Sequence, residues 1–209
     1  MSYLEMLKED VRFVDGLKAC ISCGVCTAIC PAAEFFDYDP RKVMIIVQKH
    51  REEELESLLR SNTIWYCGQC MSCKTRCPRE NTPGMVIQAL RKVSQETGNF
   101  IHSEMGRQQI TVKRTVGDNI LKLGYCVHPD TLDPEKHPEQ GTVWEWIYEN
   151  RQGLYDRVGA NLYSEGAGAV RNIDAESMEE LRSIFRETGG EKMFQLIEYY
   201  SEASNPETT

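Results

Sequence analysis

One cysteine spacing occurs twice in this chain of 209 residues. The pattern Cys-x-x-Cys-x-x-Cys-x-x-x-Cys-Pro occupies residues 20–31 and again residues 67–78, and it takes up eight of the nine cysteines. Three thiolates at two-residue intervals can wrap one face of a compact cluster from a single turning loop. The fourth thiolate must come from elsewhere. This spacing, present twice, is typical of proteins that bind two [4Fe–4S] clusters.

The same spacing predicts which cysteines share a cluster. In two-cluster proteins of this pattern, the fourth ligand of each cluster comes from the other motif. The first cluster is expected to bind Cys20, Cys23, Cys26 and Cys77. The second cluster is expected to bind Cys67, Cys70, Cys73 and Cys30. This exchange would tie the two motifs together and hold the clusters close to each other.

Two other uses of these cysteines are less consistent with the sequence. Disulfide frameworks belong to small secreted domains, and the first ten residues form an acidic amphipathic segment that does not resemble a signal peptide. Zinc sites often use two Cys-x-x-Cys pairs, but not a third cysteine at the next step followed by Cys-Pro. The ninth cysteine, Cys126, has no partner at motif spacing, and we expect it to be a small buried apolar residue.

Charge and hydropathy limit the classes of partner. The formal net charge is −8, and two oxidised clusters with their thiolates would bring it to about −12. That balance argues against nucleic acid. Residues 126–209 carry most of the acidic excess, either as a solvated surface or as a docking surface for a basic partner. The longest apolar run, residues 43–47, is far too short to enter a membrane. A cytoplasmic protein is expected.

Apolar periodicity and capping residues predict a mainly helical chain. Leucine and valine at three- and four-residue steps predict a helix over residues 4–17. Asp39-Pro40 is expected to start another, with Asp39 as N-cap and Pro40 in the first turn. The remaining expected helices are residues 52–59, 85–97, 118–125, 178–188 and 191–200. Because the connection between the motifs is long and helical, we predict an α-helical ferredoxin and not the βαβ kind.

The expected domain organisation has three parts. Residues 1–100 form the dicluster ferredoxin domain. Residues 101–173 form an extended or irregular segment with a turn-rich linker. Residues 174–209 form a C-terminal helical pair and tail, which completes a helical and irregular extension of the ferredoxin domain.

Side chains around the motifs suggest how the clusters could differ. Lys74, Arg76 and Arg79 surround the end of the second motif. Nearby cations stabilise a reduced, more negative cluster, so one hypothesis gives the second-motif cluster the higher reduction potential. The alternative is that these three cations only face water. Trp65, two residues before Cys67, is expected to be buried by packing near the cluster.

The order of these features resembles a known family. A helix, the first motif, an Asp-Pro helix, a short acidic leucine-rich helix, Trp65-Tyr66, the second motif and a final helix follow one another over roughly residues 1–125. This order resembles the C-type subunit of heterodisulfide reductase and of its sulfur-oxidising relatives. The resemblance implies a helical subunit that relays electrons through two [4Fe–4S] clusters. Its implied partners are a flavin- and cluster-bearing A-type subunit and a catalytic B-type subunit with Cys-Cys-Gly repeats.

No catalytic residue is expected in this chain, because it has neither a Cys-Cys pair nor a flavin fingerprint. One alternative is the iron–sulfur subunit of another flavin-dependent dehydrogenase, of the glycolate or glycerol-3-phosphate type. Fused forms of those proteins carry Cys-Cys-Gly domains, which are absent here. Another alternative is a regulatory protein whose clusters sense oxygen or iron. That function predicts a DNA-binding or partner-binding region, and the acidic balance disfavours DNA.

Overall fold

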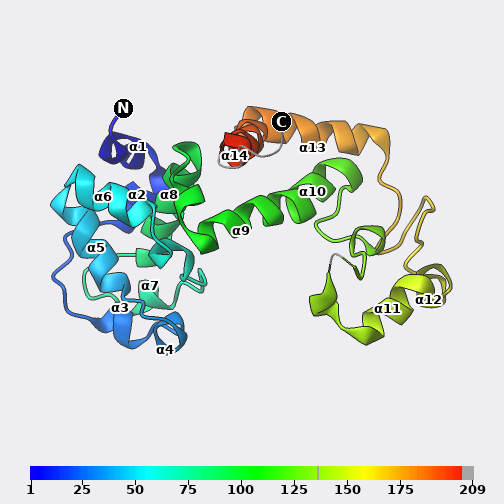
Figure 1. Ribbon diagram of the computed structural model, residues 1–209, viewed down its shortest axis with the longest axis horizontal. Helices are drawn as coiled ribbons and strands as arrows, with labels where there is room; N and C mark the ends of the chain where they lie inside the picture. Colours follow the sequence, from blue (N-terminus) through cyan, green and yellow to red (C-terminus); the bar gives the residue numbers. More distant parts are fainter. Residues whose placement is uncertain (136, 204–209) are drawn as a thin grey trace. The chain divides into compact units, whose positions relative to one another are not determined.

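The computed structural model describes residues 1–135 and 137–203 and divides the chain into two compact units (Figure 1). One unit holds residues 1–109 and the described residues from 196 onward, and the other holds residues 110–195. Helices supply the regular structure, and no β-strand occurs within the described ranges. The expected mainly α fold is confirmed.

The first unit is built mainly from the helices that precede residue 103. Its α-helices are α1 (Tyr3–Glu9), α2 (Val11–Gly16), α3 (Val25–Ala28), α4 (Ala32–Phe35), α5 (Pro40–Lys49), α6 (Glu52–Leu59), α7 (Ser72–Arg76) and α8 (Pro83–Glu96). Two short 3-10 helices are η1 (Thr63–Trp65) and η2 (Asn99–His102). Helix α8 is central, because it contacts α1, α2, α5, α6 and α7. Its buried residues include Val86, Ile87 and Leu90, so the core of this unit forms around α8.

Capping residues start and end the helices around the motifs. Asp39 accepts hydrogen bonds from the backbone N–H groups of Arg41 and Lys42 at the start of α5, and Pro40 occupies its first turn. This start is the one that the Asp-Pro pair predicts. Gly98 follows the C-cap of α8 with φ of +74°, a left-handed conformation that suits glycine. These two helices therefore begin or end where the sequence indicates.

The single helix expected over residues 4–17 is wrong, because the chain forms α1 and α2 with a break at Asp10. The Asp10 carboxylate accepts the Arg12 N–H at 2.9 Å and pairs with the Arg12 guanidinium at 2.6 Å. It therefore caps the start of α2, and its own backbone is extended. The break rotates the apolar stripe, so that Leu7 is buried whereas Val11 is 66% exposed.

The second unit includes the end of α9 (Glu104–Val112), the π-helical turn η3 (Lys113–Gly117) and α10 (Asp118–Leu123). It continues through η4 (Pro129–Thr131), η5 (Pro138–Gln140), α11 (Thr142–Glu149), α12 (Arg151–Arg157), α13 (Ala175–Glu187) and the first turns of α14 (Gly190–Ala203). Asp174 caps α13 as expected, by accepting the Ser177 N–H at 2.8 Å. The C-terminal helical pair is thus present, with α14 longer than predicted.

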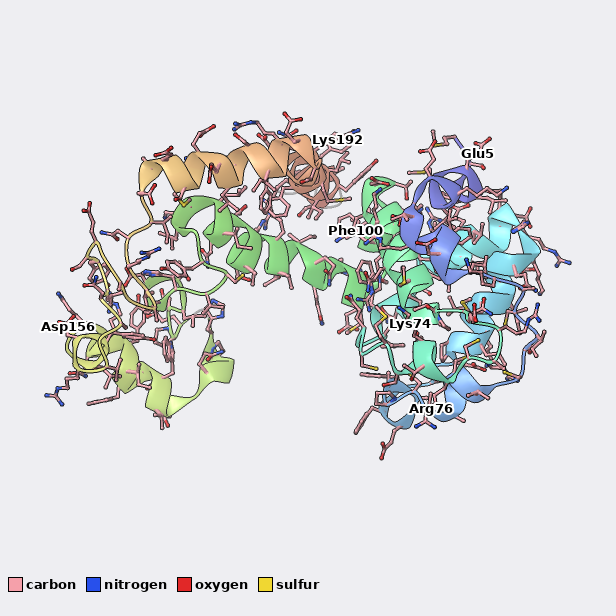
Figure 2. All side chains as sticks on the ribbon, turned by 180° about the vertical axis from the view of Figure 1, so that it is seen from behind. Glu5, Lys74, Arg76, Phe100, Asp156 and Lys192 are labelled. Atoms are coloured by element: carbon pink, nitrogen blue, oxygen red, sulfur yellow. The ribbon has the colours of Figure 1, made fainter. Side chains whose placement is uncertain are left out.

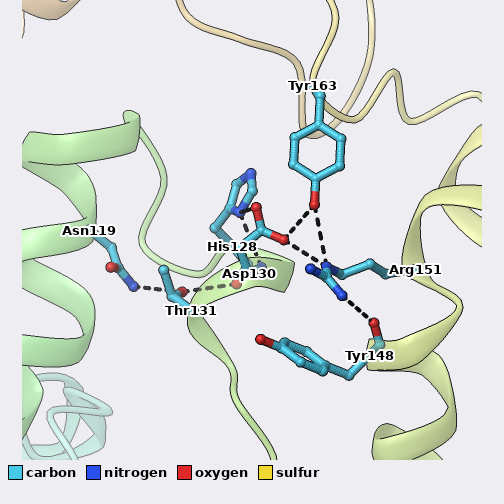
Figure 3. Close-up of polar contacts among 7 residues, drawn as sticks. All are labelled: Asn119, His128, Asp130, Thr131, Tyr148, Arg151 and Tyr163. Carbon is cyan, nitrogen blue, oxygen red and sulfur yellow. Dashed lines mark hydrogen bonds and ion pairs between the residues drawn. The ribbon is translucent and has the colours of Figure 1, made fainter.

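A polar network holds three segments of the second unit together (Figure 3). The Asp130 carboxylate accepts hydrogen bonds from Arg151 Nε at 2.7 Å and from the Tyr163 hydroxyl. Arg151 also donates to the Tyr148 carbonyl at 2.6 Å, and the guanidinium lies 4.4 Å from the Tyr148 ring centroid. His128 accepts the Asp130 N–H at 3.3 Å and is buried. This network orders part of the turn-rich segment that is expected to be irregular.

The expected division into residues 1–100, 101–173 and 174–209 stays a prediction. It concerns which parts fold separately, whereas the two units described above are defined by their compactness. In the described part of the chain, no helix combines the length and the apolar character that crossing a bilayer would require.

Candidate metal centres

The two cysteine motifs adopt the same backbone. Ser22 and Gln69, each directly before the second cysteine of its motif, have φ of 57° and 54°. Gly24 and Met71, each directly after that cysteine, have φ of 81° and 59°. Glycine adopts this left-handed conformation freely, whereas a residue with a side chain is strained there by about 1–2 kcal/mol. The repeated spacing therefore produces a repeated loop, after which α3 and α7 begin.

The first-motif cavity lies between the first loop, α5 and the end of the second motif. Its cysteines are Cys20, Cys23, Cys26 and Cys77. These are the four residues that the sequence assigns to one cluster, and Cys77 comes from the second motif. Cys23 is exposed and the other three are half-buried, so the cavity lies near the surface.

The second-motif cavity lies between the second loop, the end of the first motif and the start of α8. Its cysteines are Cys30, Cys67, Cys70 and Cys73. Cys30 comes from the first motif, which repeats the exchange in the opposite direction. Pro83, at the start of α8, lines both cavities. The structure thus brings the eight motif cysteines together as two sets of four, each with three cysteines from one motif and one from the other.

Asn81 connects the two motifs beside the first-motif cavity. Its carbonyl oxygen accepts the backbone N–H of Lys18 at 2.7 Å, and its amide nitrogen lies 3.6 Å from the Cys77 sulfur. Asn81 is only 2% exposed, so both contacts are protected from water. The backbone N–H of Thr82 adds a hydrogen bond to the Gly16 carbonyl at 2.8 Å. These contacts hold Cys77 against the start of the first motif. Lys18 and Asn81, which form one of them, are 63 residues apart in sequence.

Gln48 and Arg91 fix the first cysteine of each motif in different ways. Gln48, from α5, accepts the Cys20 N–H at 2.7 Å and donates to the Cys20 carbonyl at 3.2 Å. Arg91, from α8, donates to the carbonyls of Ile64, Trp65 and Cys67 at 2.8, 2.9 and 2.6 Å. The first motif is therefore held by a neutral amide and the second by a partly buried cation.

Sequence reasoning missed Asn81, Gln48 and Arg91. For Arg91 a signal was available, because a helical period places it on the same face as Gly84, Ile87 and Ser94, all of which are buried. A cation on a buried face needs partners. Asn81 and Gln48 lie outside any motif, and their partners are distant in sequence, so no local pattern identifies them.

The pKa values of three motif thiols are shifted, in different directions. Burial raises the pKa of Cys26 and of Cys73. Hydrogen bonds from Ser72 lower the pKa of the more exposed Cys70. Burial, and then the negative charge at Cys67, raises the pKa of Tyr38, so its hydroxyl stays protonated. Thiols with raised pKa values need bound cations to become thiolates.

The geometry of the cysteines fits a multi-iron cluster better than a single ion. Zn–S bonds of about 2.3 Å would place tetrahedral thiolates about 3.8 Å apart. Within residues 1–135 and 137–203, no three His, Cys, Asp or Glu side chains converge in a way that could hold one metal ion. Instead, each set of four cysteines lines a cavity. The residues present therefore fit a [4Fe–4S] cluster in each cavity.

The cations near the motifs are arranged differently from the sequence hypothesis. Lys74 and Arg76 lie on α7, are exposed and line neither cavity (Figure 2). Arg79 lines the first-motif cavity, because it follows Cys77, and Arg41 from α5 lines it as well. All three cations are exposed, which agrees with the alternative that they face water, and none of them lines the second-motif cavity. The exchange of Cys77 carries Arg79 to the opposite cavity.

Two further expectations about single residues have different outcomes. Cys126 is exposed, so the buried apolar role expected for it is wrong. Trp65 is buried, at 8% exposed, as expected. It lines neither cavity, however, and the Arg91 guanidinium lies 5.4 Å from its ring centroid. Trp65 therefore supports the second motif through Arg91.

Comparison with known proteins relates this geometry to a family. Residues 16–81 match the model of a 4Fe-4S dicluster domain, which spans both motifs. The chain is 46% identical over 187 residues to the C subunit of the ferredoxin:CoB-CoM heterodisulfide reductase of Methanosarcina acetivorans. That match covers 88% of this chain and 68% of the relative. The match is longer than residues 1–125, the part of the chain in which the order of motifs and helices resembles the family.

Two other relatives match shorter parts. The chain is 38% identical to the iron-sulfur C 2 subunit of the CoB–CoM heterodisulfide reductase of Methanocaldococcus jannaschii, over 58% of this chain and 58% of the relative. It is 35% identical to the C2 subunit of the H(2)/formate:CoB-CoM heterodisulfide,ferredoxin reductase of Methanococcus maripaludis, over 42% of this chain and 45% of that protein. The chain thus spans about half the length of these two relatives.

Proposed function

The chain belongs to the family of C-type subunits of heterodisulfide reductase, and we propose that it relays single electrons through two [4Fe–4S] clusters. Cys20, Cys23, Cys26 and Cys77 would hold one cluster. Cys30, Cys67, Cys70 and Cys73 would hold the other. When bound, each cluster supplies a one-electron redox couple.

One observation carries this proposal: two cavities are each lined by four cysteines, three from one motif and one from the other. A disulfide scaffold would bring cysteines together in pairs. A single-ion site would need at least three of them to converge on one point, and no three such ligands of the described residues do so. Four thiols that line one cavity are the donor set that a cubane cluster requires.

The surrounding residues hold these donors in place. Gln48 fixes the backbone of Cys20, Arg91 fixes the carbonyl of Cys67, and Asn81 fixes Cys77 against the first motif. Electron transfer favours sites that change little in geometry between oxidation states, because reorganisation raises the barrier. Gln48 from α5 and Arg91 from α8 each hold the start of one loop, and Asn81 holds Cys77, which limits that reorganisation.

We further propose that the chain connects a flavin-containing A-type subunit with a B-type subunit that carries Cys-Cys-Gly repeats. Support comes from the relatives, whose names describe subunits of heterodisulfide reductases. A Cys-Cys pair is absent from this chain, so the disulfide chemistry would take place on a partner. The exposed cysteines Cys23 and Cys70 place an edge of each cavity near the surface, where partners could approach.

Anaerobic reconstitution with iron and sulfide tests the cofactor. We expect about eight irons and eight sulfides per chain, and a reduced-state EPR spectrum of [4Fe–4S] clusters. Cys126→Ser is the matched control, since Cys126 lies outside both cavities, and it should keep the full iron content. Binding of one zinc per motif, with no iron, would refute the proposed function.

Anaerobic affinity purification from the native host tests the relay. Stoichiometric recovery of a Cys-Cys-Gly protein together with a flavoprotein would support the proposed partners. Recovery with a flavin dehydrogenase alone, of the glycolate or glycerol-3-phosphate type, would favour that alternative. It would refute the heterodisulfide relay and leave the cluster proposal intact.

A further inference from the structure

Three buried side-chain atoms in the described part of the chain have no hydrogen-bond partner: Tyr38 Oη, Arg41 Nε and Trp65 Nε1. Buried polar atoms without partners are rare and costly in folded proteins, so each requires an explanation. Trp65 lines neither cavity. Tyr38 and Arg41 each line one, and they line different ones. The distribution of these two unpartnered donors points to what the cavities contain.

Tyr38 belongs to the second-motif cavity. It lies just before α5, is 3% exposed, and its ring meets the Tyr66 ring edge-on at 6.4 Å between centroids. Its hydroxyl has no hydrogen-bond partner of ordinary geometry, but the side chain of Cys67 is near enough for a weak hydrogen bond with it. This packing gives the ring little freedom to move its hydroxyl toward another acceptor. The hydroxyl is therefore a fixed, neutral donor at the second-motif cavity.

Arg41 belongs to the first-motif cavity. Its Nη2 donates to Asp39 at 3.1 Å, and Asp39 itself caps α5 and accepts a hydrogen bond from Thr27, directly after Cys26. This contact holds one edge of the guanidinium. Its Nη1 lies near Gly24, 4.0 Å from where a Cβ would be. The side chain is 38% exposed overall, yet Nε is buried and unpartnered. Arg41 is therefore a cation that lines the first-motif cavity and carries a buried donor nitrogen without a partner.

We propose that Tyr38 and Arg41 are tuning residues, each donating a hydrogen bond to a sulfur of the cluster in its own cavity. This inference rests on the proposed function, because the acceptor is a sulfur of a bound [4Fe–4S] cluster. A hydrogen bond to sulfur stabilises the reduced, more negative cluster and so raises its reduction potential. One segment of four residues, 38–41, thus sets the two potentials independently.

Other nearby cations do not explain the unpartnered donors. Arg91 is close to Cys67, but its Nε and Nη2 already donate to three backbone carbonyls, and it lines neither cavity. Arg79 lines the first-motif cavity and is exposed, so water screens its charge. Arg41 is the cation of the first-motif cavity with a buried, unpartnered donor nitrogen.

The test is an anaerobic redox titration of the cluster-loaded protein, followed by EPR, with Tyr38→Phe and Arg41→Gln compared. Tyr38→Phe should lower the potential of the Cys30, Cys67, Cys70 and Cys73 cluster alone. Arg41→Gln should lower the potential of the other cluster alone. We expect each reduction equilibrium to weaken about tenfold, which is about 59 mV for one electron. Cys30→Ala and Cys77→Ala variants identify which signal belongs to which cluster.

Two further variants make the result specific. Lys74→Gln removes an exposed cation that lines neither cavity, and both potentials should stay unchanged. Arg41→Lys keeps the charge but lacks Nε, so it should recover only part of the loss. It also serves as a second probe if Arg41→Gln binds its cluster poorly. For Tyr38, an exchangeable proton coupled to the reduced second-motif cluster should be present in the wild type and absent in Tyr38→Phe.

Unchanged potentials in both variants, or equal shifts of both clusters in each variant, would overturn the inference. Iron content separates that outcome from failure of the proposed function. A wild-type chain that never binds two [4Fe–4S] clusters refutes the function itself. Variants with a full complement of iron and unchanged potentials refute only the tuning role.

Discussion

The two motif loops have one cysteine spacing and one backbone, but different residues hold them. The first loop places Gly24 at its left-handed position and is fixed by the neutral side chains of Gln48 and Asn81. The second loop places Met71 at that position and is fixed by Arg91. The spacing thus determines the shape that four thiolates require, whereas the surroundings of each loop are free to differ. That freedom allows the two cavities to give their clusters different properties.

The largest expected effect tests the exchange of cysteines between the loops. If Cys23 and Cys77 serve the same cluster, the double variant Cys23→Ala/Cys77→Ala should lose one cluster and keep about four irons. Cys70→Ala/Cys77→Ala should lose both clusters, because its two cysteines belong to different cavities. Iron and sulfide analysis after anaerobic reconstitution measures both.

The opposite pattern would contradict the exchange. If each motif held its own cluster, Cys70→Ala/Cys77→Ala would keep about four irons and Cys23→Ala/Cys77→Ala would keep none. Each cluster would then be bound by the four cysteines of a single motif.

The next effect concerns the cation that holds the second loop. Arg91→Met leaves the carbonyls of Ile64, Trp65 and Cys67 without these donors. We expect a loss of about 2–4 kcal/mol in the free energy of unfolding, because unsatisfied buried acceptors are costly. An anaerobic denaturant titration measures it. Lys92→Met, at the neighbouring half-exposed position, is the control and should cost less than about 1 kcal/mol.

A smaller effect concerns the left-handed position of the first loop. Gly24→Ala places a side chain at φ of +81° and should destabilise the protein by about 1–2 kcal/mol. Gly153→Ala is the control, since Gly153 lies within α12, where an added Cβ would meet nothing. It should stabilise α12 by about 0.5–1 kcal/mol. Thermal midpoints that shift in the same direction for both variants would argue against backbone strain as the cause.

The smallest effect concerns the amide that holds the first loop. Gln48→Met removes both hydrogen bonds to Cys20, but these groups are exposed and water can replace the lost partner. We expect a loss of about 1 kcal/mol or less. A cost as large as that of Arg91→Met, measured in the same titration, would mean that the two loops are held equally strongly. The two loops would then differ only in the charge of the side chain that holds them.

Residue types and their spacing were sufficient for the helical class and the family. Asp39-Pro40, Gly98 and Asp174 marked helix ends because capping depends on a few neighbouring residues. The cysteine spacing predicted two sets of four, and the two cavities are lined by those sets. Whether each set binds a cluster is the question that the double variants answer.

Other features depended on contacts between residues distant in sequence. The apolar stripe of residues 4–17 predicted one helix, but the chain breaks at Asp10, which caps α2 locally and also pairs with the distant Lys92 of α8. The hypothesis about cations read Arg79 as a neighbour of the second motif. In the fold, Cys77 carries Arg79 to the first-motif cavity. A linear pattern records only which residues are neighbours along the chain.

The sequence alone therefore predicts the ligand chemistry of this protein, through eight cysteines in two repeats. It also predicts the helical scaffold and the family. What surrounds each set of cysteines became visible only in the folded chain. Gln48, Asn81 and Arg91 reach the loops from α5, from the segment before α8 and from α8, and Tyr38 and Arg41 reach opposite cavities from one short segment. The difference arises because ligation depends on local spacing, whereas hydrogen bonding and charge depend on distances that folding creates.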